Sequence, residues 1–441
     1  MMYGAVRSVV LLVLMLLATV SYAAAPQQPN FVVIVADDLG ANDLGTFGHP
    51  VIRSPNIDQL ARNGMQFDRA FLATSSCSAS RASLLTGRYP HSTGAPKLND
   101  VVPENQRLIS SYLREAGYYT AAIGKWHNGG LVAPQFDVVK DPPGESGGEG
   151  WIDALRSRPK DKPFFFWLAS RDPHVPYSPL PPDSSYQPKD AVMLPVFYDS
   201  PEARYTIAQY YTEISRLDNY VGKVVAELRT QNLLDNTYII FLSDNGAPMP
   251  RAKTTLYDAG IKTPLIIAGP KIKAGLKTAS LVSAIDVMPT VLDLAGLPKA
   301  TTMQGESFSR LFQKPDAAFR QKIFAEQWDH GFVLNRRAIR TERYLYISNF
   351  AKNANRCILE AQPMGKALLQ AFREKKLNRE QALCFGHRAP AEELYDVQAD
   401  PMSFHNLVGD TASESVYQKM KRALKQQATD TQDTVFLQAI N

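Results

Sequence analysis

The sequence predicts an α/β fold with a large mixed, mostly parallel sheet sandwiched by helices, followed by a smaller C-terminal α+β subdomain. Five short apolar runs lack the alternation with polar residues of a half-exposed strand, which is typical of strands buried on both faces. Helical patterns lie between these runs, as in α/β proteins. The chain has 441 residues, of which 45% are hydrophobic, and this is enough to build a sizeable core.

The expected elements follow one another in a regular order. The strands cover residues 31–36, 118–123, 164–169, 238–242 and 265–268, and the clearest helices cover 57–63, 108–116 and 203–230. The segments 142–150 and 178–188 are rich in Pro, Gly and Ser and are expected to be surface loops. Four of the five strands end in carboxylates, an amide, lysine or histidines. Because ligands bind beyond the carboxyl ends of the strands in open α/β sheets, we expect these side chains to share one pocket.

The pattern changes near residue 320. Short strand-like pieces at 333–339 and 344–347 are followed by a charged helical stretch at 366–383 and a terminal helix at 413–428. We therefore expect a main α/β domain at 26–320 and a C-terminal α+β subdomain at 321–441.

Residues 1–25 are expected to be a secretory signal peptide. Arg7 precedes an apolar run at 9–20, and small residues follow it. The run is short for a bilayer span, and no later segment reaches that length; an uncleaved N-terminal anchor is the alternative. After cleavage we expect no membrane attachment and a periplasmic or secreted protein, in a compartment that permits disulfides.

Charge and cysteine content argue against two classes of protein. The chain has 48 Lys and Arg against 43 Asp and Glu, with no block of like charge, which does not favour a nucleic-acid-binding protein. Three cysteines in this length exclude a disulfide scaffold. Each cysteine therefore needs an explanation of its own.

Cys77 opens the segment with the strongest chemical pattern. Residues 75–88 read SSCSASRASLLTGR, and the helical pattern after Cys77 ends at Gly87. Cys77 is thus expected near a helix N-terminus, which favours an anionic group, with Arg81 on the same helix face. A buried structural cysteine beside a surface arginine is the alternative.

This segment resembles the signature of type I sulfatases, members of the alkaline phosphatase superfamily. In that family the cysteine is oxidised to formylglycine by a sulfatase-maturating enzyme. Ala79 stands where many members carry proline, a variation that the anaerobic radical maturation systems accept. The resemblance covers most of residues 30–300.

The resemblance implies a metal site at the strand ends. Asp37, Asp38, Asp244 and Asn245 match the family's metal ligands, together with the formylglycine oxygen made from Cys77. Oxygen ligands alone suit Ca²⁺, and Mg²⁺ is less favoured because it needs stricter octahedral order. Taken singly, an Asp-Asp pair after a strand is also typical of a helix cap, and Asp-Asn-Gly of a turn.

The resemblance also assigns catalytic roles. Lys125 and His127 match the pair that contacts formylglycine and sulfate, His174 the acid beside the leaving-group oxygen, and Lys253 a basic residue on the sulfate. In the implied mechanism one hydroxyl of the hydrated aldehyde attacks sulfur, and His127 takes the proton of the other when sulfate leaves. Taken alone, each could be a surface lysine or a hydrogen-bonded histidine.

The implied function is an exo-acting sulfatase on a sulfated oligosaccharide or polysaccharide. The short spacing from Asp244 to Lys253 and the helical run at 203–234 resemble the N-sulfoglucosamine sulfohydrolase branch, although members of that branch carry arginine where this chain has Lys253. A heparan sulfamidase is therefore one alternative. A phosphodiester or phosphonate hydrolase of the same superfamily and a non-enzymatic glycan binder are the others.

Two sets of residues complete the predictions. Arginine and aromatic side chains suit anionic sugars, so substrate contacts are expected from Arg171, Tyr177, Arg251, Trp328, His330, Arg336 and Arg337, each of which could instead be ordinary surface or core. Cys357 and Cys384 are expected to form a disulfide, with two buried free thiols as the alternative.

Overall fold

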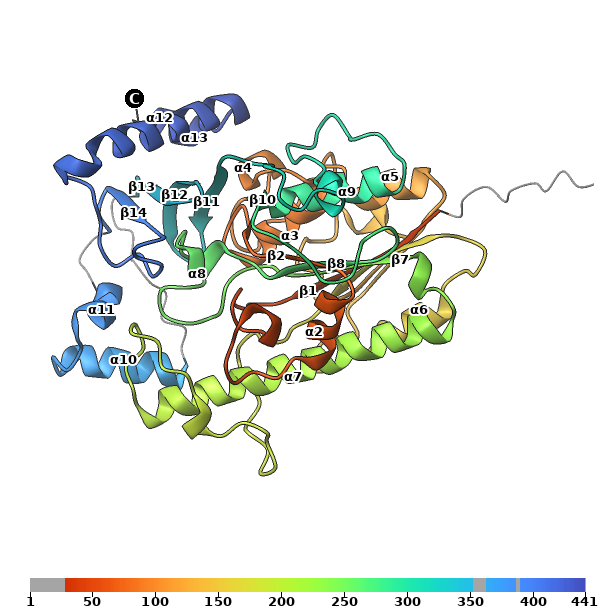
Figure 1. Ribbon diagram of the computed structural model, residues 1–441, viewed down its shortest axis with the longest axis horizontal. Coiled ribbons are helices and arrows are strands. Elements are labelled where there is room, and N and C mark those ends of the chain that lie inside the picture. Colours follow the sequence, from red (N-terminus) through yellow and green to blue (C-terminus); the bar gives the residue numbers. More distant parts are fainter. Residues whose placement is uncertain (1–27, 352–361, 386–388, 441) are drawn as a thin grey trace, which may run out of the picture.

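The computed structural model describes residues 28–351, 362–385 and 389–440, and its centre is an eight-stranded sheet with the order β5-β4-β6-β1-β7-β8-β2-β9 (Figure 1). Strand β8 is antiparallel to both of its neighbours, and the other pairs are parallel. The strands are β1 (Asn30–Ala36), β2 (Met65–Phe67), β4 (Tyr119–Gly124), β5 (Val138–Lys140), β6 (Phe164–Ala169), β7 (Thr237–Ser243), β8 (Leu265–Ala268) and β9 (Leu276–Thr278). The predicted α/β class with a mixed, mostly parallel sheet is confirmed.

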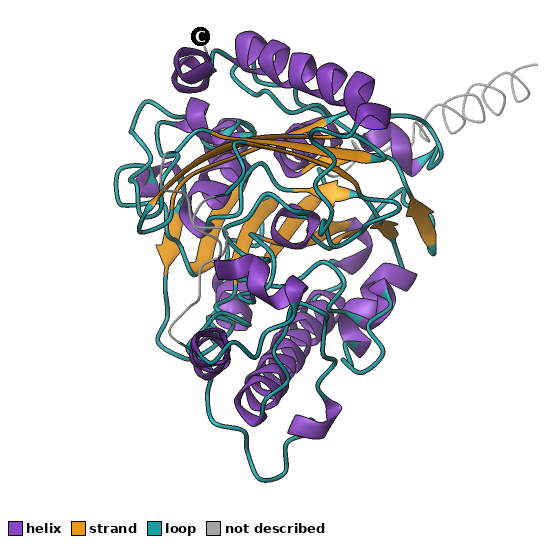
Figure 2. Ribbon diagram, turned by 90° about the vertical axis from the view of Figure 1, so that its left-hand side faces the viewer, coloured by secondary structure: helices purple, strands orange, loops and turns teal. Residues whose placement is uncertain are grey.

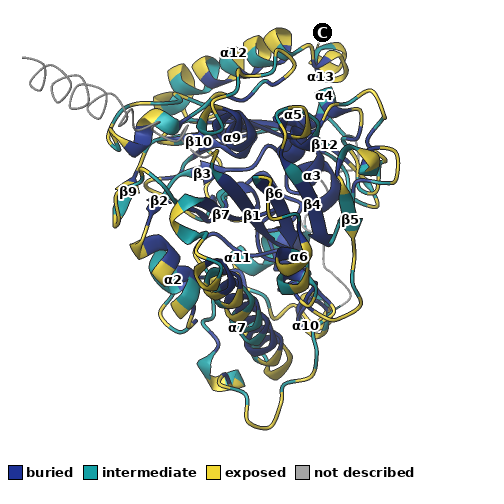
Figure 3. Cartoon of the chain, turned by 90° about the vertical axis from the view of Figure 1, so that its right-hand side faces the viewer, coloured by how far each residue is buried: buried dark blue, intermediate teal, exposed yellow. Residues whose placement is uncertain are grey.

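Helices cover both faces of this sheet (Figure 2). Val33 and Val35 of β1 belong to the core beneath one set of helices, and Val32 and Ile34 belong to the core beneath the other. Strands that are buried on both faces leave no position for a polar side chain, which explains the unbroken apolar runs. Figure 3 shows the central strands as buried throughout. The first set contains α3 (Cys77–Thr86), α5 (Ile109–Glu115) and α9 (Val287–Leu294), and the second contains α2 (Pro55–Arg62), α6 (Trp151–Ser157) and α7 (Pro201–Thr230).

Helix α7 is the longest element of the described chain, and its start follows the usual capping rules. Ser200 is the N-cap, and its Oγ accepts a hydrogen bond from Ala203 N at 3.1 Å. Pro201 occupies the first helical position, where its missing N–H costs nothing. The helix runs along one face of the central sheet (Figure 1).

A second, antiparallel sheet with the order β11-β12-β13-β14 forms the C-terminal part. It comprises β11 (Ile323–Asp329), β12 (Val333–Arg340), β13 (Tyr344–Asn349) and β14 (Glu392–Asp396). One face packs against α12 (Glu414–Thr431) and α13 (Thr434–Ile440), and the other packs against residues around α8 (Asp258–Ile261). The helical stretch predicted at 366–383 is divided into α10 (Pro363–Arg373) and α11 (Arg379–Ala382), because Lys375 adopts φ of 57° and Asn378 caps a new helix.

The remaining short elements are β3 (Ala70–Phe71), which pairs in parallel with β10 (Val282–Ser283), and α4 (Pro90–Thr93). Within the described ranges, no helix has both the length and the apolar character needed to cross a bilayer. The predicted signal peptide at 1–25 and Cys357 of the predicted disulfide lie outside the described residues, whereas Cys384 is buried. The disulfide and the domain boundary at 320 stay predictions.

Candidate active site

Four neighbouring strands bring the predicted residues to one edge of the sheet. Strands β4, β6, β1 and β7 are adjacent and parallel, so their carboxyl ends lie together. Asp37 and Asp38 follow β1, and Asp244 and Asn245 follow β7. Lys125 follows β4, and the loop after β6 carries His174. The convergence expected from the sequence is therefore present in the structure.

Cys77 is the first residue of α3, which points its N-terminus at this edge. Ser76 before it has extended backbone angles, and Gly87 ends the helix in the left-handed conformation at φ of 64°. The Cys77 side chain is buried and its Sγ lies 3.8 Å from Asp38 Oδ1. Burial raises the pKa of the Cys77 thiol, so an unmodified Cys77 is a neutral thiol and a poor nucleophile at neutral pH.

Arg81 joins the two acidic strand ends from within α3. Its Nη2 lies 2.7 Å from Asp244 Oδ2, and its Nη1 donates to the carbonyl oxygen of Lys125 at 2.8 Å. The Lys125 ammonium is paired with Asp37. Burial on its own would raise the pKa of Asp37, but Lys125 and Arg81 outweigh it and hold this pKa well below its usual range. The cations therefore keep Asp37 ionised, whereas at Asp244 burial outweighs Arg81 and raises the pKa to about 7.

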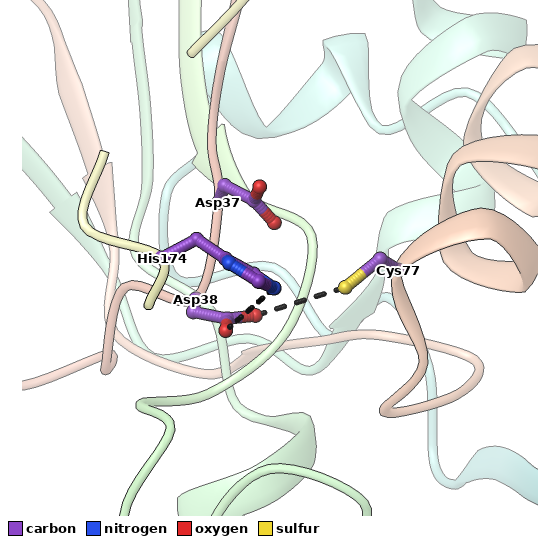
Figure 4. A group of neighbouring side chains, drawn as sticks. All are labelled: Asp37, Asp38, Cys77 and His174. Atoms are coloured by element: carbon purple, nitrogen blue, oxygen red, sulfur yellow. Dashed lines mark hydrogen bonds and ion pairs between the residues drawn. The ribbon is translucent and has the colours of Figure 1, made fainter. Parts of the chain in front are cut away.

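Asp38 is the centre of a second group of side chains. Lys253 Nζ lies 2.7 Å from Asp38 Oδ2, and the Asn245 amide donates to Oδ1 of the same carboxylate. His174 Nε2 lies 3.7 Å from Asp38 Oδ2. Figure 4 shows His174 alongside Asp38, with Cys77 facing both from the other side and Asp37 nearby. Side chains from three strand ends, one helix and the loop at 251–257 thus meet at one carboxylate.

The same residues fit a hard cation. Possible ligand atoms of Asp37, Asp38, Cys77 and His174 lie within 4.8 Å of one another. Among the described residues, the buried Oδ1 atoms of Asp37 and Asn245 have no hydrogen-bond partner. Buried oxygens without partners are costly, and a cation bound by oxygen ligands would satisfy them. The acidic cluster can therefore hold a metal ion.

Three histidines, His127, His174 and His330, lie around the acidic cluster. His174 Nδ1 faces the carbonyl oxygen of Val175, so this nitrogen carries a proton and Nε2 is left for the site. Burial and the nearby Lys125 lower the pKa of His127 to about 3, so its ring is neutral. Burial and Lys253 lower the pKa of His330 to about 4.

The structure brings only some of the predicted substrate residues to this site. His330, from the β11–β12 hairpin, has its Nδ1 3.0 Å from Oγ of Ser76, the neighbour of Cys77. Arg337 is fully buried on the opposite side of the sheet, where it pairs with Asp433 at 2.5 Å and stacks on Trp328. The prediction for Arg337 is therefore wrong. Successive residues of a strand face opposite sides, so Arg336 and Arg337 could not both reach one pocket.

The other predicted substrate residues have structural partners of their own. Arg171 pairs with Asp141, and Trp328 donates its indole N–H to Glu326 at 2.8 Å. Arg251 is buried and donates to the carbonyl oxygen of Ser403 at 2.8 Å. The partly buried Tyr177 and the buried Arg336 complete the set.

Sequence reasoning missed residues that support the site from outside it. Asn99 Oδ1 lies 2.7 Å from His127 Nε2. Tyr210 and Arg216 of α7 bind the loops after β1 and β6 respectively, through Gly40 N at 2.9 Å and Asp172 at 2.5 Å. The helical spacing of polar residues inside an otherwise buried helix was a usable signal for α7, whereas Asn99 carries no local signal.

Comparison with known proteins agrees with this geometry. The family model described as Sulfatase matches residues 29–140 and 148–297, and the model of the N-sulphoglucosamine sulphohydrolase C-terminal region matches 251–375. An ulvan-active sulfatase of Formosa agariphila is 29% identical over 90% of this chain and 74% of its own length. Human N-sulphoglucosamine sulphohydrolase is 34% identical over 61% of each chain.

A solved structure has the same fold. The structure of BT4656 in complex with D-glucosamine-2-N,6-O-disulfate matches with a TM-score of 0.73 and 19% identity, over 92% of this chain and 99% of that one. The family model covers more than half of the chain, and it spans all four strand ends together with Cys77. The chain therefore belongs to the sulfatase family, whose members are sulfuric ester hydrolases.

Proposed function

We propose that this sulfatase removes sulfate from a sulfated oligosaccharide or polysaccharide, acting from the chain end, with a formylglycine made from Cys77 and one Ca²⁺ ion. The observation that supports this most is the meeting of Cys77, the acidic cluster and Lys253 at one strand edge, with Cys77 Sγ 3.8 Å from Asp38. Burial raises the pKa of the Cys77 thiol, so the unmodified group would be a poor nucleophile for this reaction.

Asp37, Asp38, Asp244 and Asn245 would hold the cation, with the oxygen of residue 77. When present, the hydrated aldehyde supplies two hydroxyls on one carbon, and the cation makes the attacking hydroxyl more acidic. Six oxygen ligands or more suit Ca²⁺, and Mg²⁺ would require stricter octahedral geometry.

The chain's own residues would carry charge and protons. Arg81, Lys125 and Lys253 can share the charge that builds on the sulfuryl oxygens. His174 would protonate the departing oxygen from Nε2, since its Nδ1 is engaged by the Val175 carbonyl. His127, which is neutral and whose Nδ1 has no hydrogen-bond partner among the described residues, would accept the proton of the second hydroxyl.

The substrate class is inferred from the relatives and from charge. The relatives act, by their names, on ulvan and on N-sulphoglucosamine, and the solved neighbour holds a glucosamine disulfate. His330 contacts Ser76, the neighbour of Cys77 in the sequence, so we propose that it contacts the sugar. A maturating enzyme and secretion to the periplasm or the exterior complete the proposal.

Mass spectrometry of the Cys77 peptide after native expression tests the modification. We expect an aldehyde at residue 77 in the active fraction; a peptide with only the thiol in a preparation that releases sulfate would contradict the proposal. Cys77→Ala should fold with an unchanged unfolding midpoint and release no sulfate.

A sulfamidase activity is the second candidate, since the N-sulphoglucosamine sulphohydrolase C-terminal model matches residues 251–375. Release of sulfate from N-sulfated and 6-O-sulfated glucosamine, measured side by side, separates the two. Kinetics with sulfate, phosphate and phosphonate esters of one alcohol, measured in parallel, test the alternative of a phosphodiester or phosphonate hydrolase. That alternative requires the phosphorus esters to have the higher kcat/KM.

A further inference from the structure

The ring of His127 is fixed by a contact from a distant loop. His127 follows β4 with an unusual positive φ of 55°, and its Nε2 lies 2.7 Å from Asn99 Oδ1. Its other nitrogen, Nδ1, is buried and has no hydrogen-bond partner among the described residues. One end of the ring is therefore held, and the other is left without a partner.

The Asn99 contact determines which nitrogen carries the proton. An amide oxygen only accepts, so Nε2 must donate to it, and in a neutral ring Nδ1 then has a free lone pair. The reverse amide orientation would place a proton on Nδ1. A buried, unsatisfied N–H would then face the cations Lys125 and Arg81, which is the costlier arrangement.

The surroundings of His127 keep its ring neutral. The charged or titratable groups that act on it come from four elements: Lys125 after β4, Arg81 on α3, His174 after β6 and Asp37 after β1. Asp37 is the one carboxylate among them, and it is paired with Lys125. The fixed cations therefore disfavour an imidazolium.

Asn99 is itself fixed to the helix that carries Cys77. Its backbone has φ of 64°, and its N–H donates to Ser78 Oγ at 2.8 Å. The Ser78 hydroxyl donates in turn to the Lys97 carbonyl at 3.3 Å. Ser78 directly follows Cys77, so these contacts link the His127 ring to the start of α3.

We propose that Asn99 is a positioning residue that holds His127 in the Nε2–H tautomer, which leaves the Nδ1 lone pair free to act as the proton acceptor. The catalytic part of this inference rests on the proposed function, and the tautomer part stands on the geometry alone. Asn99 touches neither Cys77 nor a cluster carboxylate in any contact of the described residues, so it acts through His127.

Asn99→Asp and Asn99→Ala test the proposal, with Asn105→Asp and Asn105→Ala as matched controls in an exposed position of the same segment. A carboxylate at residue 99 favours the imidazolium and should move the acid limb of the kcat–pH profile up by roughly one unit. Asn99→Ala should lower kcat about tenfold with little change in KM, the size expected for one lost hydrogen bond of about 1.4 kcal/mol. The Asn105 variants should match the parent protein.

Nitrogen NMR of histidine-labelled protein at neutral pH reads the tautomer without any substrate. We expect the His127 Nε2 to be protonated and Nδ1 unprotonated, with this preference lost in Asn99→Ala. A protonated Nδ1 in the parent protein, or superimposable pH profiles of Asn99→Asp and the parent, would overturn the proposal. Failure of the parent protein to release sulfate, with the expected NMR signature, would instead refute the proposed function alone.

Discussion

Arg216 of α7 holds the loop that carries His174, and its loss should be one of the most damaging single changes outside the site. Its Nη2 and Nε lie 2.5 and 3.0 Å from the two carboxylate oxygens of Asp172, two residues before His174. The Asp172 carbonyl accepts from Asp37 N at 3.0 Å, so the same loop contacts the acidic cluster. Arg216→Met removes the guanidinium and its charge and keeps an unbranched stem.

The burial of the Asp172 carboxylate determines how much unfolding free energy Arg216→Met should lose. The Asp172 side chain is 1% exposed, whereas that of Arg216 is 29% exposed. Removing one partner of a buried ion pair costs about 3–5 kcal/mol, because the other charge is left uncompensated. The partial exposure of Arg216 favours the lower end, so we expect Arg216→Met to lose about 3 kcal/mol of unfolding free energy.

Arg204 provides a matched control on the same helix. It makes a bidentate pair with Asp199 at 2.6 Å, but that carboxylate is 56% exposed. Exposed pairs contribute about 0–1 kcal/mol, so Arg204→Met should cost less than 1 kcal/mol in urea unfolding. The double variant Arg216→Met/Asp172→Asn removes the stranded charge and should recover much of the loss.

Equal losses for Arg216→Met and Arg204→Met would refute this reasoning, because burial would then not determine the cost. A double variant no more stable than Arg216→Met would also refute it. In steady-state assays kcat should fall in Arg216→Met and not in Arg204→Met, since only the first pair contacts the His174 loop.

Three further changes have defined outcomes. Burial on its own would lower the pKa of His91, but Glu326 at 2.9 Å outweighs it, so the pKa of His91 in the folded protein is above its usual value. The pair therefore stabilises the fold fully below about pH 6.5, and this stabilisation is lost as pH rises through the folded pKa. Urea unfolding curves of His91→Gln should lack this pH dependence. A Cβ at Gly246 would lie 1.9 Å from Ala259 O, so Gly246→Ala should lower the thermal midpoint and the activity together. Free Ca²⁺ at 100 times its Kd should stabilise the protein by about 2.7 kcal/mol, less so in Asp244→Asn, as measured by thermal unfolding with and without chelator.

The central sheet was predictable because its strands are unbroken apolar runs. Strand β7 was expected at 238–242 and occupies Thr237–Ser243, which is an error of one residue at each end. Strand β11 was missed because Glu326 and Gln327, both fully buried, interrupt its apolar pattern. Strands such as β2 have only three residues, which is too short for a periodic pattern. The antiparallel direction of β8 depends on how the chain returns to the sheet, and the residues of the strand itself do not encode it.

The site was predictable where chemistry follows a strand end or a motif, and not where it depends on which side of a sheet a residue faces. Cys77 and Asp244 stand at such positions. In the structure Cys77 lies beside Asp38, and Asp244 pairs with Arg81 of the same helix as Cys77. The prediction for Arg337 was wrong because Arg336 and Arg337 face opposite sides of β12. Asn99 was missed because its contact with His127 joins residues 28 apart in sequence, with α5 and β4 between them.

The charges of the site explain why a divalent cation and a sulfate anion suit it together. When Asp244, whose pKa burial raises to about 7, is ionised, three carboxylates balance three fixed cations: Asp37, Asp38, Asp244, Arg81, Lys125 and Lys253. A neutral cluster attracts an anionic ester only weakly, and the net charge of +5 over the chain adds no strong field. A divalent cation on the carboxylate oxygens would give the cluster two net positive charges and would compete with Lys125 and Lys253 for their carboxylate partners. Both ammonium groups could then turn to the sulfuryl oxygens, so cation binding and substrate binding should reinforce each other.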